Sequence, residues 1–236
     1  MAKTPSPNLP HETWRRLIAT LLLVVLVIGI ALATAITLSI TVGWNTSPER
    51  FVTLILLGTT VGELAAFGLL IWRLHQEGRT LRDLGWGQPT IWWVFVLGIG
   101  IALLYSGYTV LNNPMIAHHF FDISWFKFAG LMAAIAGGFL EETLFRGYVM
   151  MSLNSMSYQR GVQVVLSGVF FALFHLYVFA DPLSLLLVQG FTFVLGVALA
   201  ITYLLGKRSL TPVIISHILV DLLLEPWLFL SFFGGR

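Results

Sequence analysis

The chain has 236 residues, of which 57% are hydrophobic and only 10% are charged. Soluble domains carry about 25% charged residues, so this chain lacks the charge to cover a water-facing surface, and lipid is its expected solvent. It has no cysteine, which excludes disulfides and thiolate metal sites, and its formal net charge of +2 gives no reason to expect a nucleic-acid partner.

Seven apolar stretches are long enough to cross about 30 Å of hydrocarbon as helices. In chain order they lie near residues 17–42, 51–72, 91–111, 126–151, 162–180, 183–205 and 211–231. The first is too long for the core of a signal peptide, about 7–15 residues, so a retained helix is expected, with cleavage near Ala31–Ala35 as the alternative. The third is followed by Asn112-Asn113-Pro114, so an eighth, short helix within 112–125 is an alternative. We predict an all-α fold, a polytopic transmembrane bundle of about seven to eight helices, with residues 1–236 in a single membrane domain.

The lysines and arginines of the predicted loops gather on one side of the membrane. Nine lie on the side of the amino terminus: Lys3, Arg15, Arg16, Arg73, Arg79, Arg82, Arg160, Lys207 and Arg208. Three lie on the other side: Arg50, Lys127 and Arg236. Because cytoplasmic loops carry the excess of basic residues, we expect a multi-pass protein of the cell membrane with its amino terminus in the cytoplasm.

Ionisable residues occur inside the predicted spans, where each costs at least ~2.5–3.5 kcal/mol and by default indicates a functional site. They are Glu63, Glu141, Glu142, Arg146, His175, His217 and Asp221. Glu142 and Arg146 stand four residues apart on one helix and can therefore pair. Glu141 lies about 100° around that helix and has no such partner. The fourth span thus carries one structural carboxylate and one available for chemistry.

Small residues continue the row of the ion pair along the fourth span. Gly130, Ala134 and Gly138 follow one another at four-residue spacing, a pattern that lets a neighbouring helix approach closely.

The depths of four polar side chains suggest one shared cavity. A rise of about 1.5 Å per residue puts Glu141, His175, His217 and Asp221 within about two helical turns of one another. The set suits peptide hydrolysis. A carboxylate takes a proton from water, and one histidine shares that water or protonates the leaving amine. A second histidine and a side-chain hydrogen-bond donor stabilise the oxyanion. Alternatively, the glutamate and two histidines hold a zinc ion that activates the water. Composition and spacing leave both mechanisms open.

At these residues the sequence resembles the CAAX-protease and bacteriocin-processing family of intramembrane endopeptidases. That family carries three motifs on separate helices, and all three stand here in order: EExxxR at 141–146, FxxxH at 171–175, and HxxxD, in place of the commoner HxxxN, at 217–221. The resemblance covers a core of about 126–225. The segment 81–86, Leu-Arg-Asp-Leu-Gly-Trp, also resembles the loop that often precedes this core.

The resemblance implies a role for each motif residue. Glu141 is the catalytic base, Glu142 pairs with Arg146, and His175 and His217 complete the site. It also implies an endopeptidase that acts on peptides or proteins in or at the membrane, with a glutamate-activated water and no cofactor. Asp221 departs from the commoner asparagine, and an ionised carboxylate cannot donate to an oxyanion. We hypothesise that Asp221 is a neutral acid; the alternative is an ionised Asp221 paired with a charged His217, which is then the donor.

Two rival functions stay open at this point. Buried glutamate, histidine and aspartate also occur in the proton relays of transporters, and a third hypothesis is a membrane scaffold without catalytic activity. For Glu63 we expect helix packing or a polar cavity wall. His118, His119 and Asp122 resemble a metal site, but in a predicted outer loop we expect them to be solvated.

Overall fold

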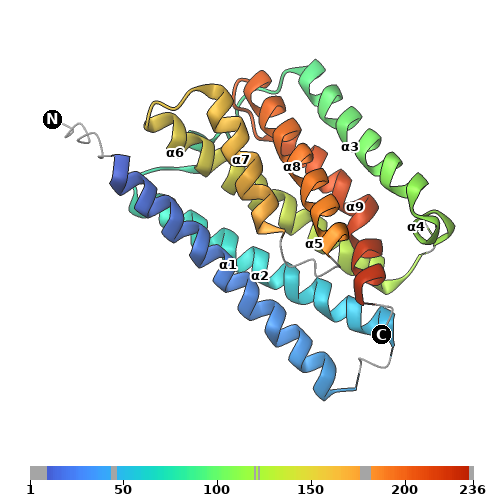
Figure 1. Ribbon diagram of the computed structural model, residues 1–236. Coiled ribbons are helices and arrows are strands. Elements are labelled where there is room, and N and C mark those ends of the chain that lie inside the picture. Colours follow the sequence, from blue (N-terminus) through green and yellow to red (C-terminus); the bar gives the residue numbers. More distant parts are fainter. Residues whose placement is uncertain (1–9, 44–46, 120, 122, 176–181, 234–236) are drawn as a thin grey trace.

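A computed structural model of the protein describes residues 10–43, 47–119, 121, 123–175 and 182–233. Within these residues every regular element is a helix, as expected, and the helices form one bundle (Figure 1). In chain order they are α1 (Pro10–Thr41), α2 (Pro48–Gln76), the 3-10 helix η2 (Leu81–Leu84), α3 (Trp92–Asn112), α4 (Pro114–His119), α5 (Trp125–Glu142), the π-helix η3 (Thr143–Val149), α6 (Met150–Ser155), α7 (Arg160–Phe174), α8 (Pro182–Leu205) and α9 (Thr211–Phe233).

Among the described residues, five stretches are long and apolar enough to cross a membrane. They are Pro10–Thr41, Pro48–Gln76, Trp92–Asn112, Trp125–Ser155 and Val188–Leu205. The predicted span 162–180 is matched only in part, because α7 has 15 residues, or about 22 Å of helix, and residues 176–181 lie outside the described part. The short helix α4 matches the alternative of an eighth helix within 112–125.

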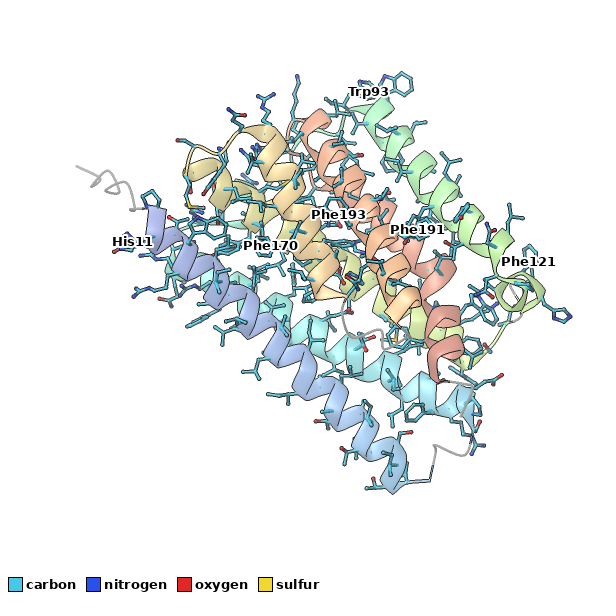
Figure 2. The ribbon with its side chains drawn as sticks, viewed as in Figure 1. His11, Trp93, Phe121, Phe170, Phe191 and Phe193 are labelled. Carbon is cyan, nitrogen blue, oxygen red and sulfur yellow. The ribbon has the colours of Figure 1, made fainter. Side chains whose placement is uncertain are left out.

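The outer helices present apolar side chains to their surroundings. Leu22 on α1 is 64% exposed and Leu104 on α3 is 77% exposed. Figure 2 shows side chains projecting outward along these helices, with Trp93 at the start of α3 and Phe121, after α4, at the opposite end of the bundle. Such a surface fits a lipid surrounding, and the protein is a multi-pass membrane protein.

The fourth predicted span is the central helix of the bundle. In its most apolar window 72% of the residues are buried, against 17% for α1. The sequence pattern assumed a continuous α-helix here, and this was wrong. After Glu142 the seven residues of η3 take π-helical hydrogen bonding, and α6 completes the span. π-Helical turns are rare and occur frequently at functional sites.

The row of small residues on α5 is where α9 approaches, as its spacing predicted. A Cβ atom on Gly138 would collide with Ile218, and one on Gly130 would collide with Pro226. Ala134, between them, is fully buried. Because His217 adjoins Ile218, this contact brings the third motif against the first.

The loop after α8 meets the end of α6 and the start of α7 at one end of the bundle, as the distribution of basic residues predicted. Arg208 Nη2 donates hydrogen bonds to Gln163 Oε1 at 2.8 Å and to Asn154 Oδ1 at 3.2 Å. Which side of the membrane this end faces stays a prediction.

Candidate functional site

Glu141 and His175 face one another across the helices α5 and α7. Glu141, the penultimate residue of α5, is 5% exposed, and its Oε2 lies 3.6 Å from Nε2 of His175. His175 follows the last residue of α7, and its Nδ1 lies 2.8 Å from the carbonyl oxygen of Phe171. A carbonyl oxygen only accepts hydrogen bonds, so Nδ1 carries a proton. In the neutral ring, Nε2 is then an acceptor directed at Glu141.

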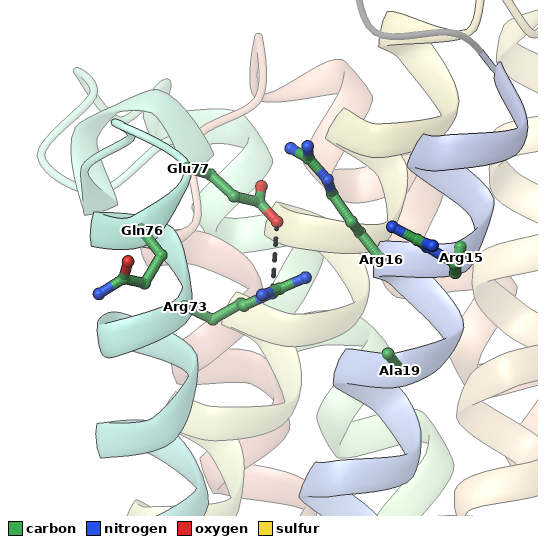
Figure 3. Close-up of a pocket in the computed structure, with 6 residues that line it drawn as sticks. All are labelled: Arg15, Arg16, Ala19, Arg73, Gln76 and Glu77. Carbon is green, nitrogen blue, oxygen red and sulfur yellow. Dashed lines mark ion pairs between the residues drawn. The ribbon is translucent and has the colours of Figure 1, made fainter.

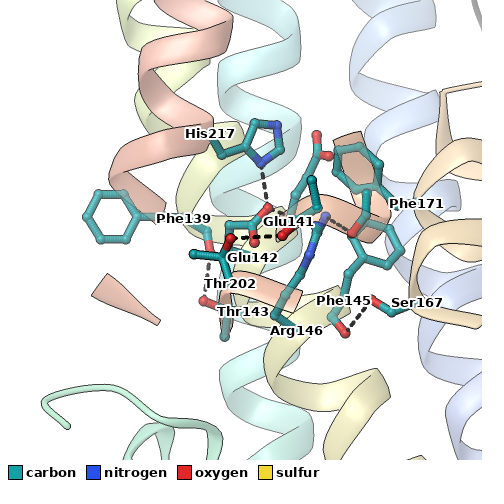
Figure 4. A network of polar contacts seen from close by, with 12 residues as sticks. Phe139, Glu141, Glu142, Thr143, Phe145, Arg146, Ser167, Phe171, Thr202 and His217 are labelled. Carbon is teal, nitrogen blue, oxygen red and sulfur yellow. Dashed lines mark hydrogen bonds and ion pairs between the residues drawn. The ribbon is translucent and has the colours of Figure 1, made fainter. Parts of the chain in front are cut away.

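Glu142 forms the expected ion pair with Arg146 and also holds a histidine. Its Oε1 lies 2.8 Å from Arg146 Nη1 and 2.7 Å from His217 Nδ1 (Figure 4). All three side chains are at most 1% exposed. A second guanidinium nitrogen, Nη2, donates to the carbonyl oxygen of Gly196 on α8 at 3.0 Å. Glu142 of α5 therefore contacts η3 through Arg146 and α9 through His217, and Arg146 extends the connection to α8.

His217 lies between two carboxyl groups. Its Nδ1 faces Glu142, and its Nε2 lies 3.2 Å from Asp221 Oδ2, one helical turn along α9. The Asp221 side chain is 21% exposed, against 1% for His217. Asp221 is thus the more accessible member of this pair.

The ring of Phe171 is the apolar centre of the cluster. The Arg146 guanidinium carbon lies 4.4 Å above its centroid, and the rings of His175 and His217 lie 4.7 and 5.4 Å away, centroid to centroid. Phe171 is 1% exposed. A buried cation stacked on an aromatic ring is stabilised by about 2 kcal/mol or more. In the sequence Phe171 is identified only as the first residue of the FxxxH motif, so its contact with three other motif residues was missed.

The loop before α3 packs directly against the first motif. Trp86 Nε1 donates to Thr143 Oγ1 at 3.1 Å, and its indole is stacked on Phe139, with ring centroids 5.3 Å apart. The buried Leu84 lies against Gly147 of η3. Gly85, between Leu84 and Trp86 in the chain, has φ +106°, and a Cβ atom there would collide with the carbonyl group of Arg208. This loop supports η3 from the basic end, which the sequence resemblance alone did not reveal.

The 3-10 turn η2 of this loop is fixed by a reciprocal cap. Asp83 Oδ2 accepts hydrogen bonds from the backbone N–H of Thr80 at 2.7 Å and from its hydroxyl at 2.9 Å. These bonds hold the pKa of Asp83 below its usual value, because they stabilise the ionised carboxylate.

The remaining polar residues singled out in the sequence lie elsewhere. Glu63 on α2 is 5% exposed, and its carboxylate packs against Gly137 of α5, which fits the expected helix packing. His118 and His119 lie on α4, and Asp122 lies outside the described residues. In the part of the chain that the structure describes, no three or more histidine, aspartate and glutamate side chains are arranged to hold a metal ion.

Comparison with known protein families gave a match over the region that holds the three motifs. Residues 123–223 match the family model described as type II CAAX prenyl endopeptidase Rce1-like. The curated proteins and the solved structures gave no match to the chain. The matched segment runs from the start of α5 into α9 and contains all three motifs at 141–146, 171–175 and 217–221. Residues 123–223 are therefore similar to the CAAX-protease and bacteriocin-processing family of intramembrane endopeptidases, the family that the motifs resemble.

Proposed function

We propose that this protein hydrolyses peptide bonds of membrane-associated substrates with a water molecule activated by Glu141. The observation that carries the proposal is that two adjacent carboxylates, Glu141 and Glu142, have different contacts. Glu142 is engaged by Arg146 and His217, at 2.8 and 2.7 Å. Glu141 Oε2 has no hydrogen-bond partner within the described residues and faces His175 Nε2 at 3.6 Å.

The pair Glu141 and His175 is suited to orient a water molecule. Both facing atoms are acceptors, since the Phe171 carbonyl group keeps the proton of a neutral His175 on Nδ1. Their separation exceeds that of a direct hydrogen bond and suits a bridge by water. Such a water donates both of its hydrogens to the pair, and its lone pairs are then directed away from Glu141 and His175, towards a substrate carbonyl carbon.

In the proposed reaction Glu141 first accepts a proton from the water and later gives it to the leaving amine. As the water oxygen bonds to the carbonyl carbon, one of its protons moves to the Glu141 carboxylate. When the carbon–nitrogen bond breaks, that proton passes to the amine nitrogen, which leaves with the bond's electron pair. The other water hydrogen stays with the new carboxyl group, and Glu141 is ionised again. A well-placed general base contributes typically 10²–10⁴-fold to the rate.

The oxyanion is stabilised from α9 in this proposal. Asp221, as a neutral acid, has a single O–H, which donates to His217 Nε2 one turn away in the resting site and turns to the developing negative charge in the transition state. We further propose that no metal takes part. This follows the family resemblance, which implies a glutamate-activated water without a cofactor.

The proposal is tested by comparing two equivalent substitutions in purified protein. Glu141→Gln keeps the shape of the side chain but cannot act as a base, so peptide cleavage, followed by mass spectrometry, should fall at least about 10²-fold. Glu63→Gln is the matched control, because it neutralises another buried carboxylate outside the three motifs. Cleavage by Glu141→Gln at the parental rate would refute the assignment. A carrier would instead show flux in vesicles that depends on Glu141, and a scaffold would tolerate both changes.

The substrate can be sought in the membrane itself. Proteomics of membranes that contain the parent or the Glu141→Ala variant should reveal peptides that accumulate uncleaved only with the variant. Prenylated protein ends and peptide precursors are substrate classes compatible with the family, and they should be examined first.

A further inference from the structure

A basic cavity lies between α1 and α2, away from the three motifs. Its volume is about 380 Å³. It is lined by Arg15, Arg16, Ala19, Arg73, Gln76 and Glu77. Figure 3 shows the arginines of α1 reaching across the gap towards the end of α2. The cavity therefore lies where the first helix enters the bundle and the second leaves it.

The charge inside this cavity is not balanced by protein groups. Its one carboxylate, Glu77, is already engaged: Oε1 lies 3.6 Å from Arg73 Nε and accepts a hydrogen bond from the Tyr148 hydroxyl at 2.8 Å. Its Oε2 lies 3.9 Å from Arg79 Nη1. Within the described residues, Arg15 and Arg16 have no carboxylate partner. Three lining arginines thus face one occupied glutamate, and the cavity attracts an anion.

The flanking residues place the cavity at the depth of lipid headgroups. Trp14 precedes Arg15, and Trp72, which is 53% exposed, precedes Arg73. Tryptophan collects at the boundary between headgroups and hydrocarbon. On α1 the apolar run starts at Leu17, directly after the two arginines. The arginines therefore lie where phospholipids carry their phosphate groups.

We propose that this cavity binds the phosphate-bearing headgroup of an anionic phospholipid. Arginine presents a planar fork of donors that matches phosphate oxygens two at a time, and basic pockets between transmembrane helices recognise anionic headgroups. The opening between two lipid-facing helices lets the acyl chains stay in the bilayer while the headgroup enters.

The site is connected to the central helix through one hydrogen bond. Tyr148, whose hydroxyl donates to Glu77, belongs to η3 and lies two residues after the end of the first motif. Its hydroxyl lies 3.4 Å from Thr20 Oγ1 on α1. A bound phosphate joins α1 to α2 on the side where both already contact η3. Because the lipid binds only the folded protein, it should also raise the unfolding temperature.

The proposal is tested by native mass spectrometry of the detergent-purified full chain, titrated with phosphatidylglycerol or with zwitterionic phosphatidylcholine. The parent should prefer phosphatidylglycerol. Each basic residue near a membrane surface contributes about fivefold in affinity, so Arg15→Gln/Arg16→Gln should bind roughly 30-fold more weakly. Arg82→Gln/Arg160→Gln is the matched control: it removes two exposed arginines from the same end of the bundle but outside the cavity, and its affinity should stay parental.

Further controls distinguish a lipid headgroup from a soluble phosphate. They also distinguish weaker binding from a loss of folding. Glycerol phosphate at millimolar concentration should not displace the lipid; if it does, the site takes a soluble phosphate and the lipid assignment is wrong. Equal weakening in both double variants, or no preference between the two lipids, would also overturn the proposal. Unfolding temperatures in neutral detergent check that the variants are folded. The single change Arg15→Gln, at an exposed residue, should still weaken binding about fivefold.

Discussion

Glu142→Gln should destabilise the protein far more than the same change at its neighbour Glu141. The carboxylate of Glu142 is fully buried and contacts two donors, Arg146 and His217. Gln keeps the shape but removes the charge, so the fully buried Arg146 guanidinium loses its counterion. Breaking a buried pair in this way costs about 3–5 kcal/mol, which lowers the ratio of folded to unfolded protein roughly 10²–10³-fold or more.

At Glu141 the same reasoning gives the opposite expectation. Its side chain is 7% exposed, and within the described residues its one ion-pair contact is with His175 Nε2 at 3.6 Å. Neutralising a buried charge with so little compensation should leave the free energy of unfolding unchanged within about 1 kcal/mol, or raise it. Glu141→Gln should therefore be folded and inactive, and Glu142→Gln should be unstable.

Both expectations can be measured by unfolding in mixed micelles of increasing SDS fraction, followed by tryptophan fluorescence. A double-mutant cycle with Arg146→Met isolates the pair. The double variant Glu142→Gln/Arg146→Met should lose about 1–3 kcal/mol less than the sum of the single changes, because it leaves neither charge alone. A Glu142→Gln variant that is as stable as the parent but inactive, beside an active Glu141→Gln variant, would show that the two roles are reversed.

Three further predictions concern packing, metal content and topology. Gly138→Val should destabilise the protein by about 1–3 kcal/mol in the same unfolding assay, because the new side chain meets Ile218; Gly100→Val, with open space around it, is the control. Cleavage should survive strong chelators, and elemental analysis should find less than one zinc per chain; activity lost to chelators and restored by zinc would contradict this. A reporter fused after position 236 should be external, since nine basic loop residues lie on the opposite side; a cytoplasmic signal would require an eighth helix or a re-entrant segment within 112–125.

The sequence predicted those parts of the structure that depend on one helix at a time. Spacing along the fourth span identified the pair Glu142–Arg146, the separate position of Glu141 and the row that ends at Gly138. Each of these needs only the angle per residue and the rise of a helix. The structure shows the ion pair, and α9 packs against the row.

What the sequence could not predict depends on how helices meet. The bond between His217 and Glu142, 75 positions apart, depends on the rotation of α9 about its axis, which the pattern of apolar residues leaves undetermined. The π-helix from Thr143 was missed because a four-residue pair forms in both helix types. The contact of Trp86 with Thr143 was missed because a polar loop carries no periodicity to analyse.

The contacts of His217 link the protonation of Asp221 to the charge of the histidine. A carboxyl group faces each ring nitrogen, Glu142 at Nδ1 and Asp221 at Nε2. Since the Glu142 carboxylate only accepts, Nδ1 carries a proton. If His217 is neutral, Nε2 accepts, and Asp221 must be the neutral acid that donates to it. If His217 is a cation, both nitrogens donate and Asp221 is ionised.

Asp221→Asn distinguishes these two states through the pH–rate profile. We expect the neutral acid, because it avoids the cost of burying a further charge pair. The amide then replaces the acid as donor to His217 and to the oxyanion. It donates at every pH, whereas the acid stops once it ionises, so the variant should stay active and its alkaline limb should move to higher pH. A cationic His217 predicts the reverse: without the carboxylate its proton is lost more easily, and the alkaline limb moves to lower pH. That shift in a folded variant would rule out the neutral acid.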